Sequence, residues 1–217
     1  MNCVVDRIEI HTLRLSQTDL GDWTECLDAS EEARAGRYVK PADRDRFRLG
    51  RGLLRTMLGK ALGIAPGRLA FRADRHGKPI LPAPCPLAFN VSHSGDLACV
   101  ALGEAASIGI DIERRRQDFD PMALGFHVLT ARELRDLELA EDRFFAFFEA
   151  WVRKEAMLKG IGTGLLKDPR EIEISHGADG PRITHAANGG PDPTQGWQLR
   201  SIALPDDYHG ALAVLHS

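Results

Sequence analysis

The pattern of apolar and polar residues predicts strands and long helices in both halves of the chain. Segments with the short apolar runs or two-residue alternation of strands lie at 4–15, 88–92, 97–102, 108–113, 171–175, 196–204 and 209–217. Segments with apolar residues every three or four positions, as in amphipathic helices, lie at 28–38, 43–62 and 141–160. This mixture in each half predicts an α+β fold.

Local signals predict a turn, a helix start and the break between the halves. His76 and Gly77 mark a turn between two extended pieces. Thr130, followed three residues later by Glu133, is typical of a capping box, in which each side chain bonds a free backbone amide of the first helical turn. We expect two subdomains, residues 1–109 and 110–217.

Composition narrows the class of protein. The 217 residues are 43% hydrophobic and 27% charged, which is ordinary for a globular chain. A net charge of −3 gives no overall attraction to nucleic acid. No apolar run approaches the roughly 20 residues that span a bilayer, and the N-terminus lacks the pattern of a signal peptide. We therefore expect a cytoplasmic protein with no nucleic-acid or membrane partner.

The cysteines predict no disulfide framework. Cys3, Cys26, Cys85 and Cys99 are scattered and form no CxxC pair. Four cysteines are too few to hold together a chain of this length by disulfides, so reduced thiols are expected.

One predicted strand carries two acids on the same face. In the segment IGIDIE, the two-residue period sends Ile108, Ile110 and Ile112 to one face. It sends Asp111 and Glu113 to the other. Two neighbouring carboxylates repel each other unless a cation or basic group lies between them. The alternative is a strand end with solvated acids, neutralised by the arginines that follow, and for this pair alone both interpretations stay open.

The third predicted helix adds another acid and a lysine. Its period places Glu155 and Lys159 on one stripe with three large aromatic residues, Phe144, Phe148 and Trp151. A carboxylate on such an apolar stripe must be paired, protonated or bound to metal. The alternative is an ion pair between Glu155 and Lys159 at the end of the helix.

Together these residues suggest a metal-dependent enzyme that acts on a phosphate ester. If Glu155 lies near Asp111 and Glu113, the site offers only oxygen ligands, which favours Mg²⁺ or Mn²⁺ over zinc. Magnesium in such sites shares its coordination with phosphate oxygens. The second predicted helix has a row of cations that could bind further phosphates or form a solvated face. This row consists of Arg44, Arg48, Arg51 and Arg55.

Five segments, taken in order, resemble the 4′-phosphopantetheinyl transferase family in its Sfp-type branch. They are GRGLLRTMLG (50–59), RHGKPIL (75–81), FNVSHSGDLACVAL (89–102), IGIDIE (108–113) and WVRKEAMLKGIGTGL (151–165). Each is a short pattern, but the five together, at family-like intervals, are specific. The regions before Lys40 and after Lys167 carry no family motif.

The resemblance implies a fold and a reaction. The fold is two similar α+β subdomains related by pseudo-twofold symmetry, with coenzyme A (CoA) in the cleft between them. The reaction transfers the 4′-phosphopantetheine arm of CoA to a serine of an apo acyl or peptidyl carrier protein and releases adenosine 3′,5′-bisphosphate. Such carriers serve fatty acid, polyketide or nonribosomal peptide synthesis. Because both halves lie in one chain, a monomer is expected.

The resemblance also implies the CoA contacts. Ser92 and His93, from the Asn-x-Ser-His-Ser motif, match residues that contact the CoA phosphates, and His93 would donate to an anion. Lys78 matches the family lysine beside the nucleotide. Looser matches, in a stretch richer in arginine than the family pattern, assign the 3′-phosphate to Lys40, Arg44 and Arg51.

The catalytic residues implied by the resemblance come from the two central motifs. The residues that match the magnesium ligands of the family are Asp111, Glu113 and Glu155. Lys159 matches the lysine that assists the departing adenosine 3′,5′-bisphosphate. Glu155 is the first choice as general base for the acceptor serine, and Glu133 is the second. Lys154 would hold phosphate.

By the same resemblance, the carrier protein docks on residues 118–136. Carrier proteins are acidic around their serine, and nearby arginines give this surface local positive charge. They are Arg114, Arg115, Arg116, Arg132 and Arg135. Met122, Leu124 and Phe126 would add apolar contact, or else form the core of a small subdomain.

Two other classes of protein use some of the same residues. A magnesium-dependent nuclease or phosphohydrolase would need the acids, but not the Ser-His-Ser and Gly-Lys-Pro segments at these spacings. A noncatalytic nucleotide-binding or partner-binding module would not need Asp111, Glu113, Glu155 and Lys159 together.

Overall fold

A computed structural model gives the structure of this protein and describes residues 2–5, 8–73, 78–82, 85, 87–162, 168–177, 180–185 and 194–216. The chain divides into two units, residues 1–104 and 105–217. The first strand of the second unit, β7 (Ser107–Arg114), pairs along its whole length with β11 (Tyr208–Leu215). Because this pairing holds all of β7 in the second unit, the boundary lies before β7 rather than between residues 109 and 110.

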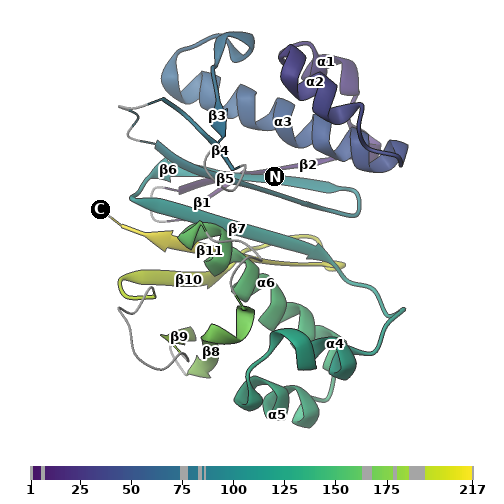
Figure 1. Ribbon diagram of the computed structural model, residues 1–217, viewed down its shortest axis with the longest axis vertical. Helices are drawn as coiled ribbons and strands as arrows, with labels where there is room; N and C mark the ends of the chain where they lie inside the picture. Colours follow the sequence, from purple (N-terminus) through teal and green to yellow (C-terminus); the bar gives the residue numbers. More distant parts are fainter. Residues whose placement is uncertain are drawn as a thin grey trace. The chain divides into compact units, whose positions relative to one another are not determined.

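The first unit contains a four-stranded antiparallel sheet with the order β1-β2-β6-β5 (Figure 1). The strands are β1 (Asn2–Val5), β2 (Ile8–Arg14), β5 (Leu87–Ser94) and β6 (Leu97–Glu104). The single strand expected at 4–15 is therefore two paired strands. β6 lies between two neighbours and is buried up to its last residue, which explains its continuous apolar sequence.

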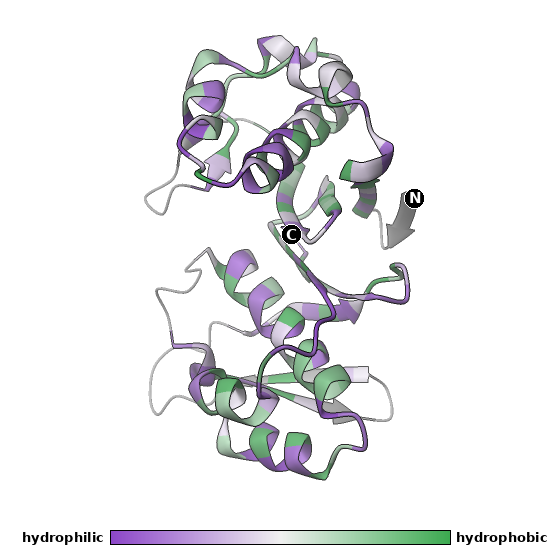
Figure 2. Cartoon of the chain, turned by 90° about the vertical axis from the view of Figure 1, so that its right-hand side faces the viewer, coloured by the Kyte–Doolittle hydropathy of each residue, from purple (hydrophilic) through white to green (hydrophobic). Residues whose placement is uncertain are grey.

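The long helix α3 (Pro41–Leu62) packs on β5 and β6 (Figure 1). Most of its charged residues lie in its N-terminal half and most of its apolar residues in its C-terminal half (Figure 2). The apolar half forms the core of the unit with side chains of the sheet. The helix ends at Gly63, whose φ of 65° is a left-handed conformation that glycine adopts without strain.

Short elements surround α3. They are η1 (Leu15–Gln17), α1 (Leu20–Thr24), α2 (Ala29–Ala35), η2 (Pro66–Arg68) and the paired strands β3 (Arg72–Ala73) and β4 (Pro79–Ile80). Both α1 and α2 pack against α3. The turn predicted at His76 and Gly77 lies outside the described residues.

The second unit also places a long helix on an antiparallel sheet. Its sheet has the order β10-β11-β7, with β10 at Trp197–Ser201, and a smaller sheet pairs β8 (Ile172–Gly177) with β9 (Gly180–His185). The helix α6 (Arg143–Ile161) packs closely on β7 and β11 (Figure 1). Gly109 permits this approach, because a Cβ there would lie 1.9 Å from the Ala156 carbonyl oxygen.

Two helices and a short 3-10 turn complete the second unit. They are α4 (Pro121–Val128), α5 (Ala131–Leu139) and η4 (Pro169–Glu171). The predicted capping box of Thr130 and Glu133 is confirmed at the start of α5. The sequence pattern did not predict α4, because the polar residues before it looked like a break between elements. Asp120 is in fact the N-cap of this helix, and its side chain accepts a hydrogen bond from the Met122 backbone amide.

The α+β prediction is confirmed in each unit, and the symmetry relation between them stays a prediction. Within the described ranges, no helix combines the length and apolar composition that crossing a bilayer requires. The three cysteines whose side chains are described, Cys26, Cys85 and Cys99, are free thiols.

Candidate active site

β7 displays its two acids on the face that α6 covers. Ile108, Ile110 and Ile112 are at most 1% exposed and occupy the opposite face of the strand, as the two-residue period predicted. Asp111 shares the α6 face with Gly109 and is itself buried at 4% exposure. Glu113, near the end of the strand, is half-buried. The strand therefore holds one carboxylate deep under the helix and a second closer to its edge.

α6 brings a lysine and a third acid to this face. Lys159 Nζ donates to Asp111 Oδ1 at 2.6 Å, so the helix and the strand are joined by an ion pair. Glu155 lies one helical turn earlier and is 8% exposed. The pKa of Glu155 is raised from 4.5 to about 7, first by burial and then by the charge of Asp111. Lys159 opposes this shift, and Glu113 makes a smaller contribution to it.

Glu155 contributes a buried oxygen to this group. Within the described part of the chain, its Oε1 has no hydrogen bond. A buried carboxylate oxygen without a donor is costly, and the all-oxygen donor set of Asp111, Glu113 and Glu155 suits Mg²⁺ or Mn²⁺. These residues therefore fit a divalent ion. Among the described residues, no three Asp, Glu, His or Cys side chains lie close enough together to bind one metal ion. A metal site shared by the three acids therefore stays a prediction.

Glu133 and Lys154 form a separate buried ion pair. Lys154 Nζ lies 2.8 Å from Glu133 Oε2 and donates to the carbonyl oxygens of Pro169 and Ile172, and its side chain is fully buried. Burial lowers the pKa of Lys154, and Glu133 opposes that shift. Glu133 also accepts from the backbone amides of Thr130 at 2.7 Å and Ile174 at 2.8 Å.

This geometry corrects two expectations. All the polar atoms of the pair bond to the protein itself, so Glu133 has no free oxygen to act as general base and Lys154 has no exposed ammonium for a phosphate. Both residues instead join α5 and α6 to η4 and β8. We assign them to the stability of the second unit.

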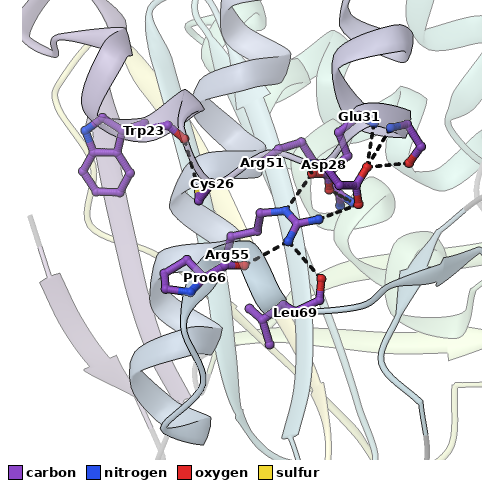
Figure 3. Close-up of polar contacts among 9 residues, drawn as sticks. Trp23, Cys26, Asp28, Glu31, Arg51, Arg55, Pro66 and Leu69 are labelled. Atoms are coloured by element: carbon purple, nitrogen blue, oxygen red, sulfur yellow. Dashed lines mark hydrogen bonds and ion pairs between the residues drawn. The ribbon is translucent and has the colours of Figure 1, made fainter.

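The arginine row of α3 is largely paired with acids of α2 and of its N-cap, and Figure 3 shows these contacts for Arg51 and Arg55. Arg55 is fully buried, donating from Nε to Glu31 Oε2 and from Nη2 to Asp28 Oδ2, both at 2.6 Å, and from Nη1 to two carbonyl oxygens. Arg51 Nε donates to Glu31 Oε1 at 2.8 Å, and Arg48 pairs with Glu32. Arg44 pairs with its neighbour Asp45, and its side chain is 39% exposed.

The acids that pair with these arginines were missed in the sequence. Asp28 and Glu31 form a capping box at the start of α2, and the same carboxylates bind Arg51 and Arg55. The Asp-x-x-Glu spacing before a helix was the available signal. Arg51 is therefore held in place by Glu31, which leaves it less able to bind a phosphate. Lys40, the exposed residue before α3, and the partly exposed Arg44 are both accessible from solvent.

The remaining predicted CoA contacts lie on the first unit. Ser92 is buried at 4% exposure and His93 is exposed, because successive residues of β5 point to opposite faces. Lys78 is half-buried and precedes β4. A cavity of about 150 Å³ in the same unit is lined in part by Arg34, Arg51, Arg72, Phe71 and Pro79, the residue after Lys78. That these residues and the acids of the second unit contact one ligand stays a prediction.

The sequence comparisons identify the class. A sequence model described as the 4′-phosphopantetheinyl transferase superfamily matches residues 107–213, and one described as 4′-phosphopantetheinyl transferase, N-terminal, matches residues 14–105. The 4′-phosphopantetheinyl transferase HetI of Nostoc sp. is 36% identical over 95% of this chain and 87% of its own. A 4′-phosphopantetheinyl transferase of Bacillus subtilis is 28% identical over 88% of this chain and 83% of its own.

A solved structure overlaps part of the chain. The holo-(acyl-carrier-protein) synthase (AcpS) of Neisseria meningitidis is 26% identical and overlaps 51% of this chain and 98% of that chain, with a TM-score of 0.42. The class is fixed by the sequence matches, which together cover both units. This chain belongs to the 4′-phosphopantetheinyl transferase superfamily and is a transferase enzyme.

Proposed function

We propose that this enzyme transfers the 4′-phosphopantetheine arm of CoA to a serine hydroxyl of an apo acyl or peptidyl carrier protein, with Mg²⁺ as the activating ion, and releases adenosine 3′,5′-bisphosphate. The observation that carries the proposal is the buried Oε1 of Glu155 in the second unit, which has no hydrogen bond to any described residue. It lies among Asp111, Glu113 and Lys159, whose charges all act on its pKa. Such an oxygen is suited to a divalent ion or to a proton.

The acids and the lysine of the second unit have distinct roles in this proposal. Asp111, Glu113 and Glu155 would hold Mg²⁺, which would neutralise charge that develops on the CoA diphosphate as its phosphoanhydride bond breaks and the phosphate ester to serine forms. Lys159 Nζ holds Asp111 in place and assists the departing adenosine 3′,5′-bisphosphate. Glu155, whose pKa lies near neutrality, accepts the proton of the acceptor serine directly or through a water.

The phosphates and the nucleotide of CoA are bound by residues of the first unit. Ser92, His93 and Lys78 contact the phosphates and the nucleotide. Lys40 and Arg44 are the better-placed candidates for the 3′-phosphate, because Arg51 is already bound to Glu31.

The carrier protein docks on α4 and the start of α5 in this proposal. Phe126 is 66% exposed and Leu124 is 39% exposed, so both can contact a partner. Met122 instead packs into the core of this subdomain. Among the arginines, Arg115 pairs with Asp142 and Arg132 with Glu173, so part of their charge is neutralised within the protein.

Mass spectrometry of the carrier tests the proposal. The enzyme is incubated with CoA, Mg²⁺ and each of several diverse apo carrier proteins, and each carrier is weighed with and without the enzyme. We expect one phosphopantetheine to be added per carrier, and no addition when Mg²⁺ is removed with a chelator or when the acceptor serine is replaced by alanine. Consumption of CoA without any gain in carrier mass would replace this proposal with a phosphohydrolase.

A further inference from the structure

A buried histidine lies beside the acids and has no role in the function proposed above. His209 is the second residue of β11 and is 5% exposed. In the pairing of β11 with β7 it stands directly opposite Glu113, while Ala211 stands opposite Asp111. Opposed residues of antiparallel strands place their side chains on one face, with Cβ atoms about 4.5–5.5 Å apart. His209 is therefore the cross-strand neighbour of Glu113 on the face that α6 covers.

The imidazole of His209 is held by α6 from two sides. Its Nδ1 lies 3.0 Å from Glu149 Oε1, and its ring stacks on Phe148 with ring centroids 5.6 Å apart and planes inclined by 10°. The ring of Phe145 makes a T-shaped contact with the imidazole, at a centroid distance of 4.8 Å. One hydrogen bond and two aromatic contacts therefore fix both the position and the plane of the ring.

Glu149 is itself anchored, so the contact with His209 is not a mobile one. Its other oxygen, Oε2, accepts from Arg153 Nη2, and the same Nη2 donates to Ser201 Oγ of β10 at 3.0 Å. Burial lowers the pKa of Arg153, and Glu149 opposes the shift. This chain of contacts connects α6, β10 and β11 beneath the helix.

The second nitrogen of the ring has no partner in the part of the chain that the structure describes. His209 Nε2 is buried and makes no hydrogen bond to any described residue. The tautomer with hydrogen on Nδ1 is the one that can donate to the facing carboxylate, and in that tautomer Nε2 is an acceptor. A buried nitrogen in this state is suited to a bound water or other donor at the site.

We propose that His209, held by Glu149, is a positioning residue for Glu113. The fixed ring restricts the Glu113 side chain to conformers that point along the strand face toward Asp111 and Glu155. This inference rests on the proposed function, because it assigns Glu113 the role of a metal ligand. Loss of a residue that orients a metal ligand without touching the metal costs about 10- to 100-fold in metal affinity or activity.

Manganese binding to the full-length protein tests the inference without the reaction. Free Mn²⁺ is measured by electron paramagnetic resonance during titration in the absence of CoA and carrier. We expect His209→Ala to weaken Mn²⁺ binding by about tenfold or more. His209→Asn should largely restore binding, because the asparagine amide can donate to Glu149 from the position of Nδ1. His209→Gln should not, because its amide lies at the position of Nε2.

Val214→Ala is the matched control. Val214 is a buried residue of the same strand, but it stands opposite Ile108 on the other face. Its variant should lower the melting temperature and leave Mn²⁺ affinity unchanged. If His209→Ala and His209→Gln bind Mn²⁺ as tightly as the wild type, His209 serves packing only and the inference is wrong. If His209→Ala does not fold, the Mn²⁺ affinities of His209→Asn and His209→Gln still test the inference, because only the asparagine variant is expected to bind nearly as tightly as the wild type.

The carrier-loading assay on the wild type keeps the two proposals apart. Wild-type protein that binds Mn²⁺ but never loads a carrier would overturn the proposed function and leave the positioning role to be judged by the His209 variants. Wild-type protein that loads carriers while the Asn and Gln variants bind Mn²⁺ equally would overturn only the positioning role.

Discussion

Lys154 and Glu155 are neighbours on α6, and both are buried charged residues, but their surroundings differ. Lys154 Nζ is matched by Glu133 Oε2 at 2.8 Å and by two carbonyl oxygens. Glu155 has an oxygen with no hydrogen bond among the described residues and a second acid, Asp111, close enough to raise its pKa. The first arrangement is complete within the protein, whereas the second is complete only with a ligand or a proton.

The comparison shows how to separate structural from functional charge. Both residues are in one motif of the family, so proximity in sequence does not distinguish them. A buried charge whose partners are all internal stabilises the native state, and removing one member exposes the other to an apolar environment. A buried charge that lacks partners lowers stability, and proteins keep such groups where chemistry requires them. The predictions below test this distinction.

The largest effect is expected for Glu155→Gln on activity. The amide keeps the size of the side chain but removes the negative charge that would bind Mg²⁺ and the oxygen that would accept a proton. The rate of carrier loading should fall by about a thousandfold or more. The rate of mass gain of the carrier measures this. Circular dichroism should report an intact fold, and a rate within tenfold of the wild type would exclude Glu155 from the chemistry.

For Lys154→Met we expect a loss of stability and not of activity. It leaves Glu133 buried without its cation, so the free energy of unfolding should fall by about 3–5 kcal/mol. Urea unfolding followed by tryptophan fluorescence measures this. The double variant Lys154→Met with Glu133→Gln should lose less than the sum of the single variants, because neither charge is then left alone. Additive losses would mean that the two residues are not a pair.

The carrier-loading activity of Lys154→Met tests whether this lysine has a purely structural role. Folded Lys154→Met should load carriers at a rate within a few fold of the wild type at a temperature where it is fully native. A loss comparable to that of Glu155→Gln would return Lys154 to the residues expected to bind the CoA phosphates.

The sequence predicted the elements of the site better than the partners of each charge. The alternation of 108–113 correctly placed Asp111 on the strand face opposite the isoleucines, and the helical period of 141–160 placed Glu155 on a buried stripe, because backbone period alone sets which face a residue takes. It could not tell that Lys154 points to Glu133 of α5, since that contact depends on how α5 packs. The same applies to Arg55, whose partners come from α2.

The pattern of apolar and polar residues also failed to predict some elements of the fold. α4 begins with Asp120 and Pro121 after a run of charged residues, so its short apolar stretch was not read as a helix. β9 was missed as well, while β8 was predicted as 171–175 and lies at Ile172–Gly177. Short elements have few residues in which a period can appear, and tertiary contacts decide them.

The pH dependence of stability is a smaller effect with a defined sign. In the metal-free folded state the pKa of Glu155 is about 7, against 4.5 when it is unperturbed. Between these values the folded state holds a proton that the unfolded state has released, so stability falls as pH rises from about 4.5 and levels off above about 7. The total loss should be about 1–3 kcal/mol.

Comparison with Glu155→Gln isolates this loss. The variant has no carboxyl group at this position, so its advantage in unfolding free energy over the metal-free wild type should grow between pH 4.5 and pH 7.5. Adding Mg²⁺ at pH 8 should stabilise the wild type and leave the variant unchanged. A constant difference across this range would show that Glu155 is not destabilised by its surroundings.

The smallest effect is expected on α3, where the same distinction separates Arg44 from Arg55. The side chain of Arg44 is 39% exposed and bonds its neighbour Asp45, whereas that of Arg55 is fully buried between Asp28 and Glu31. Arg44→Ala should raise the KM for CoA by about two- to fivefold, less at high salt, because an exposed contact to a phosphate contributes about 1 kcal/mol or less. Arg55→Met should lower the melting temperature and leave this KM unchanged. Steady-state kinetics and thermal unfolding of both variants measure the two effects, and an unchanged KM for Arg44→Ala at low salt would remove this residue from the CoA site.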